Sequence, residues 1–142
     1  MEYELGKSYE QLTIGQKDCF AKTISETDIY LFAGISGDFN AAHLNEAYAT
    51  TTVFKTRIAH GFIPMSLCAG VIGMKLPGLG TIVIDAYTKF LRPTYIGDTI
   101  TATVEVVEKS DDKRSVKLDL TWINQKGELI CEGWVQVLPP KS

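Results

Sequence analysis

Apolar and polar residues alternate with a period of two over much of the second half of the chain. The alternation is clearest in 99–108 (TITATVEVVE) and 116–122 (VKLDLTW), and we interpret 81–91 and 128–138 as two further strands. This period is typical of β-strands that bury one face and expose the other. A sheet with one apolar face must pack that face against another layer, so the sequence predicts a sheet covered by helical structure.

Short polar segments connect these strands. The connections 109–114 (KSDDKR) and 124–127 (NQKG) have the length and the residue types of hairpin turns. We therefore expect antiparallel neighbours in the sheet. A further strand is predicted within 14–23.

Two helical segments precede the long strands. Thr27 is the expected N-cap of the first helix, which should end at Gly37 because glycine is a common stop signal. A second, shorter helix is expected after His43, in 45–50 (NEAYAT).

A third helix is predicted in 61–76 (GFIPMSLCAGVIGMKL), which is apolar nearly all round and should be enclosed by other structure. Pro64 fits only the first turn of a helix, so the helix should begin at 61–63. A stripe of small residues at helical spacing, which would let a sheet approach closely, consists of Ser66, Ala69, Gly70 and Gly73. The expected fold is α+β, with an antiparallel sheet wrapped around a long central helix.

Length and composition limit the possible functions. The chain has 142 residues, 45% hydrophobic and 22% charged, and we expect one globular domain over 1–142. The net charge of −3 and the lack of a Lys/Arg cluster argue against a nucleic-acid partner. With no signal-like start and no apolar run of membrane-spanning length, a cytoplasmic protein without membrane contact is expected. The three cysteines have no CxxC spacing, so neither disulfides nor a zinc site is predicted, and we expect reduced, mostly buried thiols.

The segment 37–43 (GDFNAAH) concentrates groups that can move protons. Asp38 and His43 can both reach one water molecule if the chain turns between them, and Asn40 could orient that water or a substrate carbonyl. The alternative interpretation is structural, because Asp and Asn are common turn formers and a single His is often a structural residue.

A second segment, 57–64 (RIAHGFIP), leads into the central helix. The first N–H groups of a helix lack partners within it, so the amides of Gly61 and Phe62 would stabilise negative charge on a carbonyl oxygen placed there. Gly61 would also leave room for that group to approach. The alternative is that Gly61 only permits a tight turn.

Taken together, these segments resemble the MaoC-like hydratases, the (R)-specific enoyl-CoA hydratase family of the hot-dog fold. The family motif D-x-N-P-x-H is matched by DFNAAH at 38–43, and its H-G entry to the central helix by YATTTVFKTRIAHGF at 48–62. The passage FLRPTYIGDTITATVEV at 90–106 is similar to the family's strand-turn-strand segment. The resemblance extends from about residue 10 to the end, and it departs at Ala41, where the family has proline.

The resemblance implies reversible hydration of a trans-2-enoyl-CoA to the (R)-3-hydroxyacyl-CoA, with no metal or redox cofactor. It implies that Asp38 and His43 activate water with support from Asn40, and that the Gly61 amide polarises the thioester carbonyl. Ser66 is similar in place to a serine near the family's catalytic pair, although a small packing residue is the alternative. The chain could instead be a hot-dog thioesterase or a non-catalytic acyl-CoA binding subunit, and the dyad-bearing turn favours the hydratase.

The resemblance also implies a homodimer with acyl-CoA sites between the subunits. His60 is expected to fix the loop before the central helix rather than to act in catalysis. Lys55, Arg57 and Arg92 are candidates for contacts with CoA phosphates, with a solvated face as the alternative.

Overall fold

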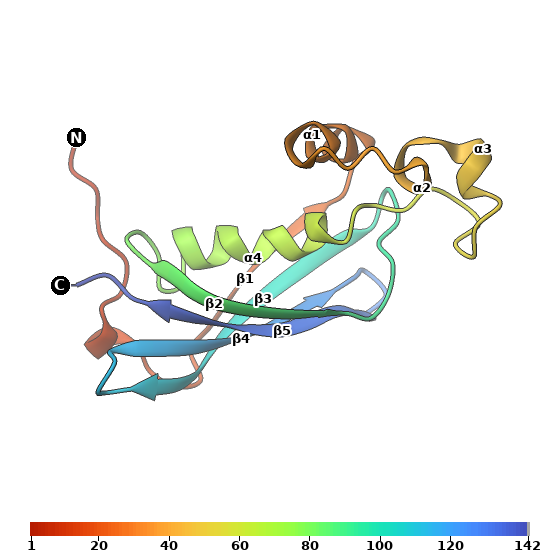
Figure 1. Ribbon diagram of the computed structural model, residues 1–142. Coiled ribbons are helices and arrows are strands. Elements are labelled where there is room, and N and C mark those ends of the chain that lie inside the picture. Colours follow the sequence, from red (N-terminus) through yellow and green to blue (C-terminus); the bar gives the residue numbers. More distant parts are fainter. Residues whose placement is uncertain (142) are drawn as a thin grey trace.

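A computed structural model, which describes residues 1–141, consists of one curved antiparallel sheet and a helix in its hollow (Figure 1). The central helix is α4, Phe62–Met74. The five strands are β1 (Lys17–Thr23), β2 (Ile82–Phe90), β3 (Thr99–Ser110), β4 (Ser115–Ile123) and β5 (Leu129–Leu138). The predicted α+β fold, a sheet wrapped around a central helix, is confirmed.

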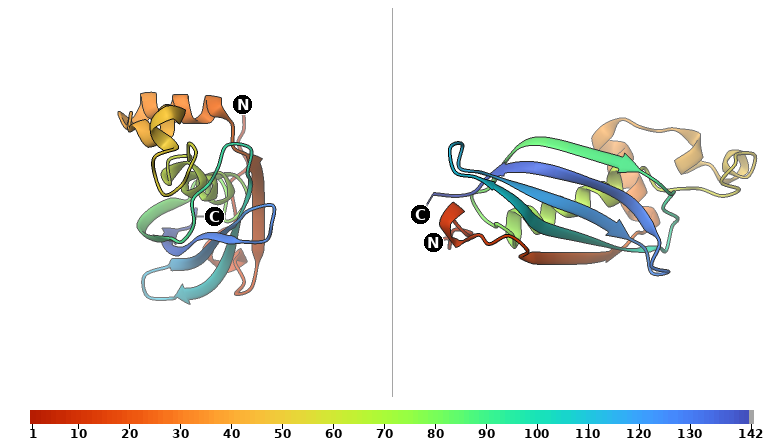
Figure 2. Two further views of the ribbon diagram at one scale, coloured as in Figure 1. Left: turned by 90° about the vertical axis from the view of Figure 1, so that its right-hand side faces the viewer. Right: turned by 90° about the horizontal axis from the view of Figure 1, so that it is seen from below.

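The strand order β1-β3-β4-β5-β2 follows from the turns that the sequence predicts. The two hairpins place β4 between β3 and β5, with antiparallel pairing throughout. The earlier strands then add to the outside, β1 beside β3 and β2 beside β5. As a result β1 and β2 are the edges of the sheet, and the helix lies across its concave face (Figure 2).

The core fills the space between α4 and the sheet. The helix contributes its large apolar side chains, and Pro64 lies in its first turn as predicted. Fully buried strand residues include Ile100, Val104, Val106, Val116, Leu118 and Trp122. Burial of this apolar area, at about 25 cal/mol per Å², is the main force that holds helix and sheet together.

The small residues of α4 lie on the opposite side of the helix. Ser66, Ala69 and Gly70 are exposed, and a Cβ atom added at Gly70 or Gly73 would meet nothing within 4 Å. The prediction that this stripe faces the sheet is wrong, as is the expectation that α4 is enclosed all round. The sheet packs against the larger side chains because they bury more apolar area, so the small residues are left facing solvent.

Three short helices form a lobe at the N-terminal end of α4 (Figures 1 and 2). They are α1 (Glu26–Ser36), α2 (Ala41–Leu44) and α3 (Glu46–Ala49); a 3₁₀ turn, η1 (Tyr9–Gln11), lies near the N-terminus. The N-cap of α1 is Ser25 rather than the predicted Thr27, because Ser25 and Asp28 form a reciprocal capping box. The helix ends as predicted at Gly37, whose φ of 77° suits glycine.

The edge strand β2 exposes apolar side chains. Ile82, Val83, Ile84, Tyr87 and Phe90 are each between 48% and 59% exposed. An unpaired apolar edge is a surface on which another chain can pair.

None of the helices within residues 1–141 has the length and hydropathy needed to cross a bilayer.

Candidate active site

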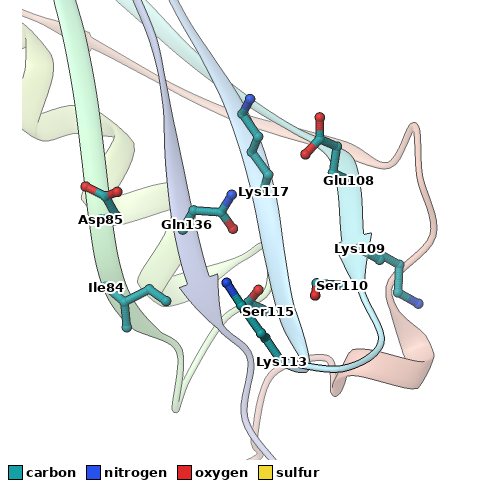
Figure 3. A pocket seen from close by; sticks show the side chains of 9 residues that line it. All are labelled: Ile84, Asp85, Glu108, Lys109, Ser110, Lys113, Ser115, Lys117 and Gln136. Atoms are coloured by element: carbon teal, nitrogen blue, oxygen red, sulfur yellow. The ribbon is translucent and has the colours of Figure 1, made fainter.

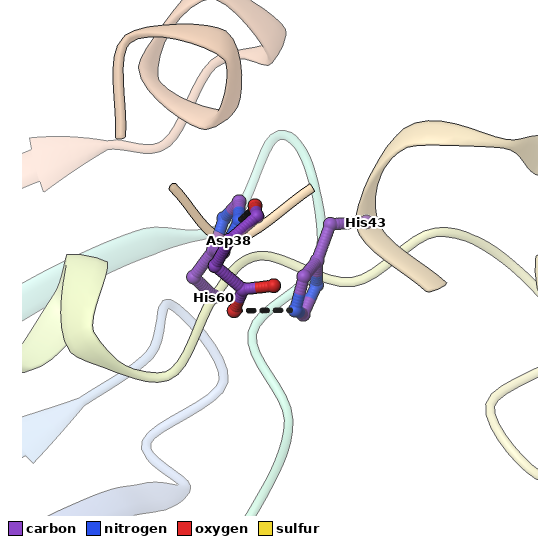
Figure 4. Close-up of side chains that lie close together, drawn as sticks. All are labelled: Asp38, His43 and His60. Atoms are coloured by element: carbon purple, nitrogen blue, oxygen red, sulfur yellow. Dashed lines mark hydrogen bonds and ion pairs between the residues drawn. The ribbon is translucent and has the colours of Figure 1, made fainter. Parts of the chain in front are cut away.

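Three side chains from two separate segments of the chain converge beside the N-terminal end of α4 (Figure 4). Asp38 follows the end of α1, His43 lies in α2, and His60 directly precedes Gly61 at the start of α4. One ring nitrogen or carboxylate oxygen of each residue lies within 4.8 Å of those of the other two. The loop between α3 and α4 is what brings 57–61 back against 38–43.

The turn that was predicted between Asp38 and His43 is present, and local hydrogen bonds explain it. Asp38 Oδ1 accepts the Asn40 N–H at 3.1 Å, and Asn40 Oδ1 accepts the Ala42 N–H at 3.0 Å. Asn40 is therefore the N-cap of α2. Its side-chain oxygen holds the turn, and the predicted contact of Asn40 with water or substrate stays a prediction.

The ring of His43 is oriented by the main chain. Its Nδ1 lies 2.8 Å from the carbonyl oxygen of Ile58, so Nδ1 carries the proton in the neutral ring and Nε2 has a free lone pair. That Nε2 lies 3.8 Å from Asp38 Oδ2, which is too far for a hydrogen bond. One water molecule about 2.8 Å from each atom fits between them. The His43 side chain is 11% exposed and that of Asp38 48%, so solvent reaches the pair from the Asp38 side.

Arg57 binds the main chain of α2 at His43. Its Nε donates to the carbonyl oxygen of His43 at 2.7 Å, and its Nη1 donates to Glu26 Oε1 at 2.6 Å. The hydrogen bond from Arg57, followed by one from Tyr30, holds the pKa of Glu26 below its ordinary value. The Arg57 side chain is 11% exposed and is bound by these groups, which favours a structural role over the predicted contact with a CoA phosphate. Sequence reasoning missed its contact with His43, which no local pattern signals.

His60 is 1% exposed and contacts both other members of the cluster. Its Nε2 lies 2.8 Å from the carbonyl oxygen of Asp38, and its ring centroid lies 3.9 Å from that of His43 with an interplanar angle of 31°. The two rings are tilted relative to each other, and His60 packs against His43 while it binds the main chain of Asp38.

Gly61 has φ −56° and ψ −31°, an ordinary helical conformation, so the alternative that glycine serves a tight turn is wrong. Space is limited at this position, because a Cβ atom there would lie 3.0 Å from Cε1 of Phe90, whose ring would have to shift. Within residues 1–141 the Gly61 N–H has no hydrogen-bond acceptor. An unpaired amide at the start of the 13-residue helix α4 is suited to bind an anionic oxygen.

A cavity of about 300 Å³ is lined by two of these residues, His43 and Gly61, but not by Asp38 or His60. His43 and Gly61 lie in its wall, so the free base and the free amide face one space. Its remaining wall is mainly apolar: Phe54, Ile58, Ala59, Pro64, Phe90, Leu91, Arg92, Pro93, Thr94, Ile130 and Cys131. A carbonyl compound bound here would meet the N–H of Gly61 and the His43 ring, and its own bulk would exclude water from the mainly apolar wall.

Ser66 is the predicted site residue that the structure does not bring into the cluster. Its hydroxyl donates to the carbonyl oxygen of Ile63 at 2.6 Å, within its own helix. Among the residues that the structure describes, no hydrogen bond connects it with Asp38, His43 or His60. A serine in a helix readily bonds to the preceding turn, which accounts for this arrangement.

The three cysteines are free thiols, as predicted. Burial raises the pKa of Cys68 and that of Cys131 to about 11. Cys131 lines the cavity, yet a protonated thiol is a weak nucleophile. Cys68 and Cys131 are buried and Cys19 is exposed, so two of the three thiols are buried as expected.

A larger cavity of about 450 Å³ lies near the β3–β4 hairpin (Figure 3). Side chains of both charges line it, among them Asp85, Glu108 and Lys117. It contains no histidine or cysteine, and it does not include any member of the Asp38 cluster. The smaller cavity is therefore the better candidate for chemistry, since it combines a base with an unpaired amide.

Comparisons with known proteins show the family to which the chain is similar. The family model described as "MaoC like domain" matches residues 10–126. An (R)-specific enoyl-CoA hydratase from Rhodospirillum rubrum is 48% identical over 132 residues, which is 93% of this chain and 91% of the relative. A 3-hydroxybutyryl-CoA dehydratase from Methylorubrum extorquens is 38% identical over 94% of this chain and 85% of its own. Among solved structures, the R-hydratase PhaJ1 from Pseudomonas aeruginosa has a TM-score of 0.91 and 39% identity, covering 96% of this chain and 88% of that one.

Proposed function

The chain belongs to the family of MaoC-like domains, and on this premise we propose that it is an (R)-specific enoyl-CoA hydratase. It adds water reversibly across the double bond of a trans-2-enoyl-CoA to give the (R)-3-hydroxyacyl-CoA, and the reverse reaction is the dehydration. The observation that carries the proposal is the placement of His43 Nε2 opposite Asp38 Oδ2, 3.8 Å apart, beside the unpaired amide of Gly61.

The first step is polarisation of the thioester. The carbonyl oxygen of the substrate accepts a hydrogen bond from the Gly61 N–H, and the positive end of the α4 dipole adds to the effect. Withdrawal of electrons through the conjugated double bond makes C3 electrophilic. The same hydrogen bond strengthens as negative charge develops on the oxygen of the enolate, so it favours the transition state over the ground state.

The second step is activation of water. A water molecule held between Asp38 Oδ2 and His43 Nε2 lies next to the only ring nitrogen of His43 that has a free lone pair. As its oxygen adds to C3, the water gives a proton to the pair, and the positive charge that forms on His43 is stabilised by the Asp38 carboxylate and the Ile58 carbonyl. The pair then returns one proton to C2 of the enolate. One proton is taken and one is delivered, so the pair ends in its starting state.

The proposal includes a homodimer. Support comes from β2, an edge strand of the sheet with exposed apolar side chains, and from the exposed small residues of α4. Pairing of two such edges would bury this apolar surface and bring a second subunit toward the cavity. Sedimentation equilibrium tests this. A species of twice the chain mass is expected, and a fully active monomer would contradict it.

The reaction is tested with crotonyl-CoA and two simultaneous signals, the absorbance of the conjugated enoyl thioester and the release of free thiol. A hydratase lowers the absorbance and releases no thiol. Asp38→Asn should lower the rate by about 100-fold or more, since it removes one partner of a proton-transfer pair. Asp119→Asn, at an exposed position of β4, is the matched control and should retain the rate. Thiol release would indicate a thioesterase instead, and a variant Asp38→Asn of full activity would contradict the assigned pair.

A further inference from the structure

The side chain of His60 contacts both Asp38 and His43 in the structure. We propose that His60 is a positioning residue that fixes the distance and orientation of the Asp38/His43 pair without touching substrate. This inference rests on the proposed function, because it assigns His60 a role in the same reaction. Its support comes from three separate observations on the His60 ring.

The first observation is the hydrogen bond to the main chain of Asp38. The Nε2–H of His60 donates to the Asp38 carbonyl oxygen at 2.8 Å. Asp38 lies directly after the glycine that ends α1, where no helical hydrogen bonds restrain the chain. The bond from His60 therefore holds the backbone from which the carboxylate extends. Without it, the backbone of Asp38 would be restrained mainly by local turn contacts.

The second observation is the contact between the two imidazole rings. Their centroids are 3.9 Å apart and their planes are tilted by 31°, so the His60 ring packs against the His43 ring. Phe32 of α1 packs against His60 in turn, with its ring centroid at 4.8 Å. The Ile58 carbonyl fixes Nδ1 of His43, and the packing of His60 restricts rotation of the ring about that bond. Both contacts favour the orientation in which Nε2 of His43 is directed at Asp38.

The third observation is the unpaired nitrogen of His60. Its Nδ1 is buried and has no hydrogen-bond partner among the described residues. Burial of an unsatisfied polar atom opposes folding, so a residue chosen for packing alone would be apolar. This unfavourable contribution occurs at a position where the Nε2–H of the ring bonds to Asp38 and the ring packs against His43. Both contacts together need an aromatic ring with an N–H at this position, and histidine provides it.

Two substitutions separate the two contacts. His60→Gln places an amide donor near the position of Nε2 and so can keep the bond to Asp38, but it removes the ring. His60→Phe keeps a ring against His43 and removes the donor. His60→Ala removes both. We expect kcat for crotonyl-CoA hydration to fall roughly 10- to 100-fold in His60→Ala, and by less in the other two, with KM within about threefold of the wild type.

Loss of stability is measured separately. Val106→Ala, a fully buried position of β3 outside the cavity, is the control: it should lower the melting temperature and leave kcat per folded protein unchanged. Unchanged kcat in all three His60 variants would overturn the inference. A rise in KM alone would also overturn it, since that would make His60 a substrate-binding residue.

A measurement on the wild-type protein does not depend on whether the variants fold. The chain has only 2 histidines, so ¹⁵N NMR of the imidazole nitrogens reports on these two rings alone. At neutral pH we expect opposite tautomers, with the proton on Nδ1 of His43 and on Nε2 of His60, and a nuclear Overhauser effect between the rings. A proton on Nδ1 of His60 would exclude the bond to Asp38 and overturn the inference. Failure of the proposed function would appear differently, as a wild-type protein without hydratase activity or an Asp38→Asn variant that keeps it.

Discussion

The Nε of Arg57 lies 2.7 Å from the carbonyl oxygen of His43, so a charged side chain far along the loop holds the helix that carries the proposed base. Arg57→Met keeps much of the apolar stem but removes both the bond to His43 and the ion pair with Glu26. We expect kcat to fall by about tenfold, because α2 is then free to shift relative to Asp38. Steady-state kinetics with crotonyl-CoA measure this. Lys22→Met, which breaks a different ion pair of α1, should keep the wild-type kcat.

The same ion pair makes stability depend on pH on the acid side. Hydrogen bonds from Arg57 and Tyr30 lower the pKa of Glu26 below its ordinary 4.5, so this carboxylate stabilises the fold above pH 4.5 and that contribution is lost as pH falls through the folded-state pKa. In Glu26→Gln the free energy of unfolding should be lower at neutral pH and should fall less steeply below pH 4.5. Urea unfolding between pH 3 and pH 7 measures it. Identical slopes in the two proteins would contradict this prediction.

Ala41→Pro should stabilise the protein. Ala41 is the first residue of α2, where proline is favoured, and Asn40 has the extended ψ of 130° that a following proline requires. No hydrogen bond from the Ala41 N–H is found within residues 1–141. The free energy of unfolding should rise by about 0.4–1 kcal/mol, with kcat unchanged, as determined by urea unfolding and enzyme assay. A less stable variant would mean that the ring clashes at this position.

Gly61→Ala should impair catalysis. The new Cβ would lie 3.0 Å from the Phe90 ring, which must move within the cavity where the thioester is proposed to bind. We expect kcat/KM to fall about tenfold or more, since the Gly61 amide is the proposed donor to the oxyanion. Gly34→Ala is the control. A Cβ at Gly34 meets nothing within 4 Å, so this exposed position in α1 should gain about 0.5–1 kcal/mol of stability at unchanged activity.

The cysteines should differ sharply in reactivity. Iodoacetamide at pH 8 should modify Cys19 in the native protein, while Cys68 and Cys131, with pKa values of about 11, react only after unfolding. Mass spectrometry counts the modified sites. The raised pKa values also favour the folded state below the ordinary value of 9.0, and this stabilisation is lost as pH rises through about 11. Rapid modification of all three native thiols would contradict the assigned burial.

Sequence patterns predicted the elements whose signals are local. The alternating strands with short polar turns, the helix start marked by Pro64 and the turn from Asp38 to His43 are all present. Each depends on residues that are close in the sequence. The N-cap of α1 was missed although its signal is also local, since Ser25 precedes Asp28 by the spacing of a capping box.

Other features depend on contacts that no local pattern contains. A helix that is apolar nearly all round does not indicate which side meets the sheet, and the small residues of α4 proved to face away from it. Ser66 has the right spacing from the H-G pair but bonds within its helix. The bond from Arg57 to His43 crosses from the loop to α2, and only the folded chain reveals it.

The proposed Asp38/His43 pair and the proposed oxyanion donor Gly61 all come from the single stretch 38–61. The sheet and most of α4 contribute walls to the cavity but none of these groups. Substitutions in those walls therefore offer a way to change which acyl chain is accepted without replacing the groups that move protons.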